Sequence, residues 1–270
     1  MTTIPRTVPP TSPARAVDGV RVTGRRVLAA EWIKARSVRS TWWLLAAVVA
    51  SLVAAGVSPA LTFALGGEGS GEATADATGG ALSGVSFTQL LVAALGVVLV
   101  SSEYGSGLIR ATFAAVPSRL PVLAGKAGVA TVTTFLPALR RVLAAFVAAQ
   151  AVLAGADVSI SLSNPGVLQA VVGAALFLAV SAVLGTAFGW LVRSTAGALA
   201  AVFGFLFVLP LLGLLLPGIT PYLPSNAGTA ILQTEPVAGS LGPWAGLGLF
   251  AGYAAVLLAV AGYVLRRRDA

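Results

Sequence analysis

Long apolar stretches, each close to the length that crosses a lipid bilayer, dominate the pattern of hydrophobic and polar positions along this chain. A transmembrane helix needs about 20 mainly apolar residues. Six stretches meet or approach this length, at residues 42–65, 85–102, 120–155, 167–192, 198–216 and 243–265. We therefore predict an all-α fold, a polytopic membrane protein in which residues 42–265 form one domain of six transmembrane helices.

The segments before the first span have a different pattern. Residues 1–20 are rich in proline, threonine and arginine without periodicity, which predicts a disordered N-terminal tail. In residues 21–41, Leu28 and Trp32 share one side of a helix, and Arg36 falls on that side too. Because long arginine side chains can extend to water, this pattern predicts an interfacial helix. The alternative is a simple basic anchor before the first span.

Charged residues divide the connections between spans into two groups. Lysine and arginine occur before span one, between spans two and three, between spans four and five, and in the basic C-terminus at 266–270. The three opposite connections contain acidic residues and no lysine or arginine. Cytoplasmic loops of membrane proteins carry an excess of lysine and arginine. Both termini are therefore predicted to be cytoplasmic.

The composition argues against several classes of function. The chain is 57% hydrophobic and 10% charged, and it has no cysteine and no histidine. Disulfides, thiolate chemistry, the usual zinc sites and a Ser/His/Asp triad are thereby excluded. The net charge of +8 is concentrated at the ends of apolar runs, which a bilayer explains without nucleic acid. We expect no catalytic residue, no metal and no enzymatic activity in this chain.

A nucleotide site is also missing from the sequence. A P-loop needs a glycine-rich turn followed by Lys and Ser or Thr, after a strand. The two glycines of "GVRVTGRR" lack that pair, and "AGKAG" lacks the upstream glycine. We expect no cofactor bound by this chain, so any ATP and magnesium would be held by a separate polypeptide.

The connection between spans two and three, "SSEYGSGLIRATFAAVPSR", is short, charged and patterned. Gly105 and Gly107 permit a sharp turn out of the second span. On a helix after that turn, Ile109 and Phe113 share an apolar face, and Arg110 lies opposite. This pattern favours a short amphipathic helix that a partner could bind. The alternative is a solvated loop whose charges serve only the topology.

Glu103 lies at the boundary of the second span, just before this turn. Its carboxylate favours the positive end of the following helix. Arg119 and Lys126 are near enough in sequence to pair with it. We therefore include Glu103 and Arg119 in the candidate binding element.

Three segments carry a resemblance to a known family: "LAAEWIKARSVRSTWWLL", "SSEYGSGLIRATFAAVPSRLPVLAGKAGVA" and "YLPSNAGTAIL". Together with the six-span plan, they make the chain resemble the permease subunits of bacterial ABC transporters of the type-two exporter class. The resemblance implies a connecting helix that contains Leu28, Trp32, Lys34 and Arg36. It also implies a cytoplasmic coupling helix, whose segment takes in Glu103, Gly105, Gly107, Ile109, Arg110, Phe113 and Arg119.

The same resemblance implies partners and a location. We expect a separate ABC ATPase subunit in two copies, and a homodimer or a heterodimer with a second permease. The location would be the bacterial cytoplasmic (inner) membrane, and the substrate could be a drug, antibiotic, lipid or peptide. The alternatives are a non-transporting scaffold or regulatory protein, and a secondary transporter, which normally shows more spans, internal repeats or membrane-embedded acids.

Arg140 and Arg141 depart from this pattern, because a single crossing between Lys126 and Asp157 places them inside the third span. Charges there are costly and usually face a cavity or a partner. One interpretation is a substrate pathway lined by this pair and by Gln150. A second is a span shifted outward, so that the arginines emerge beyond the membrane. A third is a locally altered sequence with impaired function.

Overall fold

The structure is a computed structural model, and it describes residues 23–37, 43, 46–47, 50–51, 82, 84–153, 161–234, 237 and 239–267. The predicted tail at 1–20 and most of the predicted first span lie outside these residues. Within them, every regular element is a helix, as the apolar pattern predicts.

Five of the helical segments are long and apolar enough to cross a membrane. They are α5 (Gly84–Gly105), α7 (Leu120–Leu153), α8 (Val167–Val192), the run from Thr195 to Leu214 that begins with α9 (Thr195–Phe203), and α11 (Pro243–Arg267). They coincide with the predicted spans two to six, so the described part of the chain has the architecture of a multi-pass membrane protein. The number of six spans is not tested, because the first lies mainly outside the described residues.

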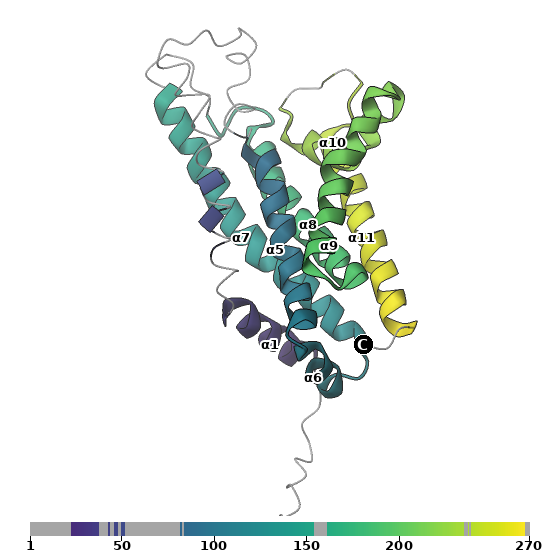
Figure 1. The fold of residues 1–270 in the computed structure, drawn as a ribbon. Helices are drawn as coiled ribbons and strands as arrows, with labels where there is room; N and C mark the ends of the chain where they lie inside the picture. Colours follow the sequence, from purple (N-terminus) through teal and green to yellow (C-terminus); the bar gives the residue numbers. More distant parts are fainter. Residues whose placement is uncertain are drawn as a thin grey trace, which may run out of the picture.

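Two short helices lie together at one end of this bundle, α1 (Gly24–Ser37) and α6 (Leu108–Ala115), and α11 ends at the same end (Figure 1). We call it the α6 end. The opposite end carries α10 (Pro224–Thr229), and we call it the α10 end.

Helix α8 is the centre of the bundle. It packs against α5, α7 and α11, and side chains such as Phe177, Leu184 and Trp190 are almost completely buried. A helix that is apolar all round and buried on most sides needs no polar face. The other spans are therefore arranged around α8.

Small residues allow α5 and α8 to approach closely. A methyl group added to Gly96 would overlap the carbonyl oxygen of Ala182, and one added to Gly185 would overlap that of Ala93. Small residues at such crossings are a common way for membrane helices to gain packing contacts. The pair α5–α8 thus forms a tight backbone-to-backbone contact in the middle of the bundle.

The fifth predicted span is interrupted near Pro210. After α9 the chain forms a π-helical turn, η2 (Gly204–Val208), and a 3₁₀ turn, η3 (Leu209–Leu214). Proline has no N–H, and it disrupts regular helical hydrogen bonding. The break therefore lies where the sequence places the proline.

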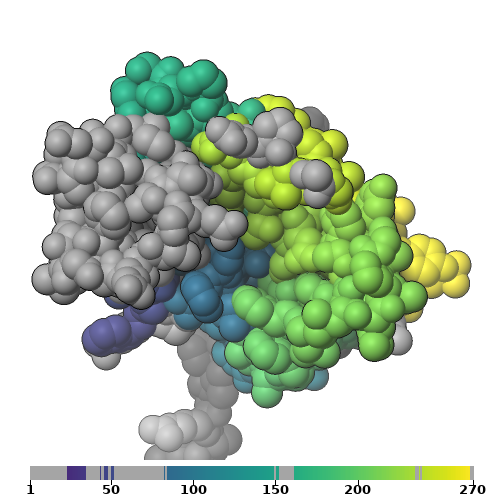
Figure 2. All heavy atoms as spheres, turned by 90° about the horizontal axis from the view of Figure 1, so that it is seen from above, coloured from purple at the N-terminus to yellow at the C-terminus, as the bar shows by residue number. Residues whose placement is uncertain are grey.

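The connection from 217 to 242, predicted as a simple loop, contains three short helical elements. They are η4 (Pro217–Tyr222), α10 and η5 (Ala230–Leu232). Gly228 lies against the rings of Phe177 and Phe250, so this segment packs onto α8 and α11. Seen from above, it lies in green beside the blue α5 and partly covers the α10 end (Figure 2).

We predict that Gly96→Ala and Gly185→Ala each destabilise the protein by roughly 1–3 kcal/mol, because the added methyl group must push α5 and α8 apart. The matched control is Gly252→Ala in α11, where an added methyl group meets nothing within 4 Å. Thermal unfolding in detergent should show a lower midpoint for both α5–α8 variants and an unchanged midpoint for the control. Equal midpoints for all three would contradict the close crossing.

Candidate functional site

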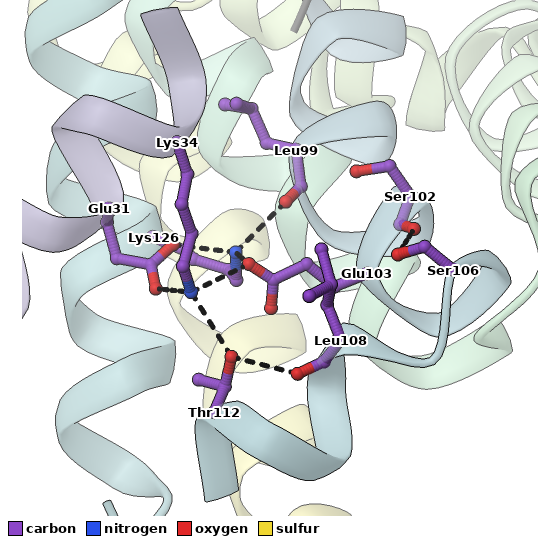
Figure 3. Close-up of polar contacts among 9 residues, drawn as sticks. All are labelled: Glu31, Lys34, Leu99, Ser102, Glu103, Ser106, Leu108, Thr112 and Lys126. Carbon is purple, nitrogen blue, oxygen red and sulfur yellow. Dashed lines mark hydrogen bonds and ion pairs between the residues drawn. The ribbon is translucent and has the colours of Figure 1, made fainter. Parts of the chain in front are cut away.

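A buried cluster of ion pairs joins helices at the α6 end. Lys126, near the start of α7, donates through Nζ to Glu31 Oε2 at 2.7 Å and to Glu103 Oε1 at 2.8 Å (Figure 3). It also donates to the carbonyl oxygen of Leu99 at 3.1 Å. Lys126, Glu31 and Glu103 are only 3%, 4% and 5% exposed. The ammonium of Lys126 therefore bridges α1 and α5 inside the protein.

Lys34 of α1 is the second cation of this cluster. Its Nζ donates to Glu31 Oε1 at 2.8 Å, to Glu103 Oε1 at 2.9 Å and to Thr112 Oγ1 at 3.2 Å. The Thr112 hydroxyl donates in turn to the Leu108 carbonyl within α6. We name Glu31, Lys34, Glu103 and Lys126 the ion cluster. Its formal charge is zero, and through Thr112 it reaches α6.

The charge of Lys34 is firmly held at neutral pH. Burial alone would lower the pKa of this lysine, but hydrogen bonds and the charges of Glu31 and Glu103 outweigh it and raise the pKa above its ordinary value of 10.5. A lysine whose pKa is raised by folding contributes stability that is complete below the unfolded pKa and is lost as the pH rises through the folded one. This contribution is thus constant across the physiological range.

Helix α6 has the predicted amphipathic form. Gly107 adopts φ 74° at its start, a left-handed conformation that favours glycine, whereas Gly105 simply ends α5. Ile109 and Phe113 are buried, at 4% and 8% exposure. Arg110 is exposed on the opposite side. One face of α6 is therefore fixed to the bundle and the other is open.

The buried face of α6 is held by aromatic contacts as well as by Thr112. The Phe113 ring stacks on Trp190 of α8, with centroids 6.3 Å apart. The guanidinium of Arg119 lies 5.3 Å from the centre of the Phe113 ring, and its Nη1 donates to the Leu265 carbonyl of α11. Of the two basic residues predicted as partners of Glu103, Lys126 forms the ion pair, and Arg119 links α6 to α11.

Helix α1 buries one face against the bundle and leaves exposed Leu28 and Trp32 of the predicted interfacial helix. Val27 and Glu31 are buried, whereas Leu28 and Trp32 are 44% and 38% exposed. The side chain of Arg36 lies outside the described part. The apolar pattern of this segment does not point to Glu31, although Glu31 is the only acid in the basic segment 22–40.

A groove of about 300 Å³ runs between α1 and α6. Its walls are mostly apolar, and they include Val27, Ala30, Glu31, Lys34, Leu108, Ala111, Thr112, Ala115, Val116 and Val122. Within the described residues, no group of three or more His, Cys, Asp or Glu side chains could hold a metal ion. The open α6 face and this groove are suited to docking a protein segment.

The three residues of the predicted substrate pathway all lie on α7. Arg140 is exposed and Arg141 is half-buried. Gln150 lies further along the same helix, about 15 Å from Arg140 at 1.5 Å per residue. The substrate pathway stays a prediction.

Comparison with known proteins adds no relative. No protein-family model matches the chain, and no curated protein matches it. The functional interpretation therefore depends on the site geometry and the sequence.

We predict that Lys126→Met destabilises the protein by about 3–5 kcal/mol, because it leaves Glu31 and Glu103 buried with too little positive charge. Arg110→Met is the control, since Arg110 is exposed and a surface change of this kind stays within about 0.5 kcal/mol. Thermal unfolding in detergent measures both. A Lys126→Met midpoint equal to that of the control would show that the ion cluster does not hold the helices together.

Proposed function

We propose that this chain is the permease subunit of an ATP-driven ABC exporter, which couples through α6 to a separate ATPase. The observation that carries the proposal is the way in which α6 packs against the bundle. This eight-residue helix lies outside the spans, with Ile109 and Phe113 buried and Leu108 56% exposed. A helix held so firmly on one side and open on the other is suited to receiving a partner's push.

Charge distribution supports a cytoplasmic position for the α6 end. Arg110 lies in α6 and Arg119 follows it, Arg193 ends α8, and Arg266 and Arg267 lie in the last turn of α11. The positive-inside rule places such residues on the cytoplasmic side. An ATPase uses cytoplasmic ATP, so it would meet the chain at this end.

The connections of α6 explain how a push could reach the spans. Thr112 contacts Lys34 and thereby the ion cluster of α1, α5 and α7. Phe113 contacts Trp190 of α8, and Arg119 contacts α11. Displacing α6 would therefore transmit the movement to several helices at once. Closure of two ATPase subunits on ATP and magnesium could shift the bundle between two packings.

The remaining features of the proposal follow from the sequence resemblance. The complex would contain two ATPase copies and a second permease, either another copy or a homologue. It would lie in the bacterial inner membrane, with Leu28 and Trp32 of α1 towards the lipid interface. The lack of a P-loop in the sequence supports an energy source outside this chain.

The position of Arg140 and Arg141 favours a span shifted outward over a substrate site. The residues from Leu120 to Leu139 rise about 30 Å, which is the thickness of a hydrocarbon core. On this interpretation the arginine pair lies at the outer interface, and the rest of α7 extends beyond it.

A secondary transporter is less well supported. Such proteins often place acids near the middle of the membrane for ion coupling. In the described spans the buried acid is Glu103, which lies at the α6 end and pairs with Lys126. A scaffold without transport activity would keep the same docking surface. A measurement of ATP-dependent export distinguishes such a scaffold from an exporter.

We predict that Leu108→Asp and Arg110→Glu together abolish co-purification with the proposed ABC ATPase partner, because both change the open face of α6. Both residues are exposed, so the unfolding midpoint should stay within a few degrees of wild type. Glu103 is unsuitable for this test because it is buried in the ion cluster.

The matched control is Arg266→Glu, an exposed charge reversal at the same end of the bundle but outside α6. It should keep the ATPase bound. If the unsubstituted chain never binds an ATPase, or if the α6 variant binds it as well as the control does, the proposed coupling role is wrong.

A further inference from the structure

Pro210 removes the α-helical donor for one backbone oxygen of the broken fifth span. In an α-helix the carbonyl of residue 206 accepts from the N–H of residue 210. Residue 210 is proline, which has no N–H. Leu206 is 1% exposed, so its carbonyl cannot rely on water. The Ser225 hydroxyl of α10 fills this gap and donates to the Leu206 oxygen at 2.5 Å.

Ser225 also meets α5. Its Oγ lies 3.3 Å from the Oε1 of Gln89, which is 1% exposed, and the Nε2 of Gln89 is buried without a partner. A serine hydroxyl has one hydrogen, and here the Leu206 carbonyl takes it. Turning the Gln89 amide over would let Nε2 donate to Ser225 Oγ. Ser225 then accepts from α5 and donates to the broken span.

We propose that Ser225 is a latch, which fastens the segment from 217 to 232 across α5 and the broken fifth span and so keeps the α10 end closed. We name Gln89, Leu206 and Ser225 the Ser225 clasp. This inference rests on the proposed function for its purpose, since an exporter must open its outer end to release a substrate. The clasp itself is a property of the described contacts.

Other contacts also hold the segment from 217 to 232 in place. One side of this segment is packed by apolar contact, with Gly228 against Phe177 and Phe250. Its internal bonds, Asn226 Nδ2 to the Thr220 carbonyl and Tyr253 Oη to the Tyr222 carbonyl, tie it to itself and to α11. Thr220 Oγ1 donates to the Gly213 carbonyl of the broken span at 3.3 Å, and Ser225 adds the side-chain hydrogen bonds to Leu206 and to α5. Releasing the latch would let the segment move with α11.

The test uses the absence of cysteine from the chain. Ala227 lies in α10 and is 0% exposed, so Ala227→Cys provides a single thiol beneath the closed segment. The chain in lipid nanodiscs is treated with a water-soluble maleimide, and the labelling rate reports how often the segment opens. Adding Ser225→Ala should raise the rate roughly three- to tenfold, the loss expected for one hydrogen bond.

Two further variants separate a latch from a general structural role. Ser225→Thr keeps the hydroxyl and should keep the slow rate. Ser240→Ala removes another serine with side-chain hydrogen bonds at the α10 end, and it should also label slowly. Fast labelling confined to Ser225→Ala supports the latch. Equal rates in Ser225→Ala and Ser240→Ala overturn it.

The double variant Pro210→Ala with Ser225→Ala gives the sharpest comparison. It restores an N–H that can satisfy the Leu206 carbonyl, but it does not restore the tether to α10. Labelling that stays fast supports the latch, whereas a return to the slow rate means that Ser225 only repairs the backbone and overturns it. None of these rates depends on an ATPase, so failure of the latch and failure of the proposed export function are distinguishable.

Discussion

Charge neutrality in a buried space is the constraint on which the α6 end depends. An ammonium or a carboxylate in an apolar interior costs several kcal/mol unless a partner compensates it. Lys126 is therefore fixed between Glu31 and Glu103, and each acid must come from a different helix. The consequence is geometric, because α1, α5 and α7 can pack there only in the arrangement that brings these groups within hydrogen-bonding distance. The position of α6 follows from that arrangement through Lys34 and Thr112.

The middle of the bundle is held by a different principle. Between α5 and α8, backbone lies against backbone at Gly96 and Gly185, and side-chain chemistry plays little part. The α10 end combines both principles, with apolar packing of Gly228 and polar contacts made by Ser225, Thr220 and Tyr253. The three levels of the molecule thus differ in the kind of contact that holds them together.

Much of this architecture could be predicted from the sequence, because apolar length and loop charge are properties of single segments. Spans two to six, the turn at Gly107, the amphipathic α6 and the break near Pro210 all follow from local pattern. The ion cluster could not be predicted in the same way. Nothing local connects Glu31 with Lys126, which are 95 positions apart, and their proximity results from how α1 packs on α7.

The failures have the same cause. The segment after Leu216 looks like a loop because its glycines, prolines and polar residues lack a period, yet its short helices are stabilised by α8 and α11. On α1, the apolar pattern drew attention to Leu28 and Trp32, which are exposed, and not to Glu31, which makes the buried contact.

The order of the ion cluster along the chain bears on how the protein is built. Glu31 and Lys34 belong to α1, and they form a neutral pair one helical turn apart. Glu103 and Lys126 belong to the hairpin of α5 and α7, and they form a second neutral pair. Each half is therefore electrically balanced before it meets the other. During insertion into the bilayer, neither half has to wait for the other to neutralise it, and the two can be synthesised, inserted and then joined without ever burying a net charge.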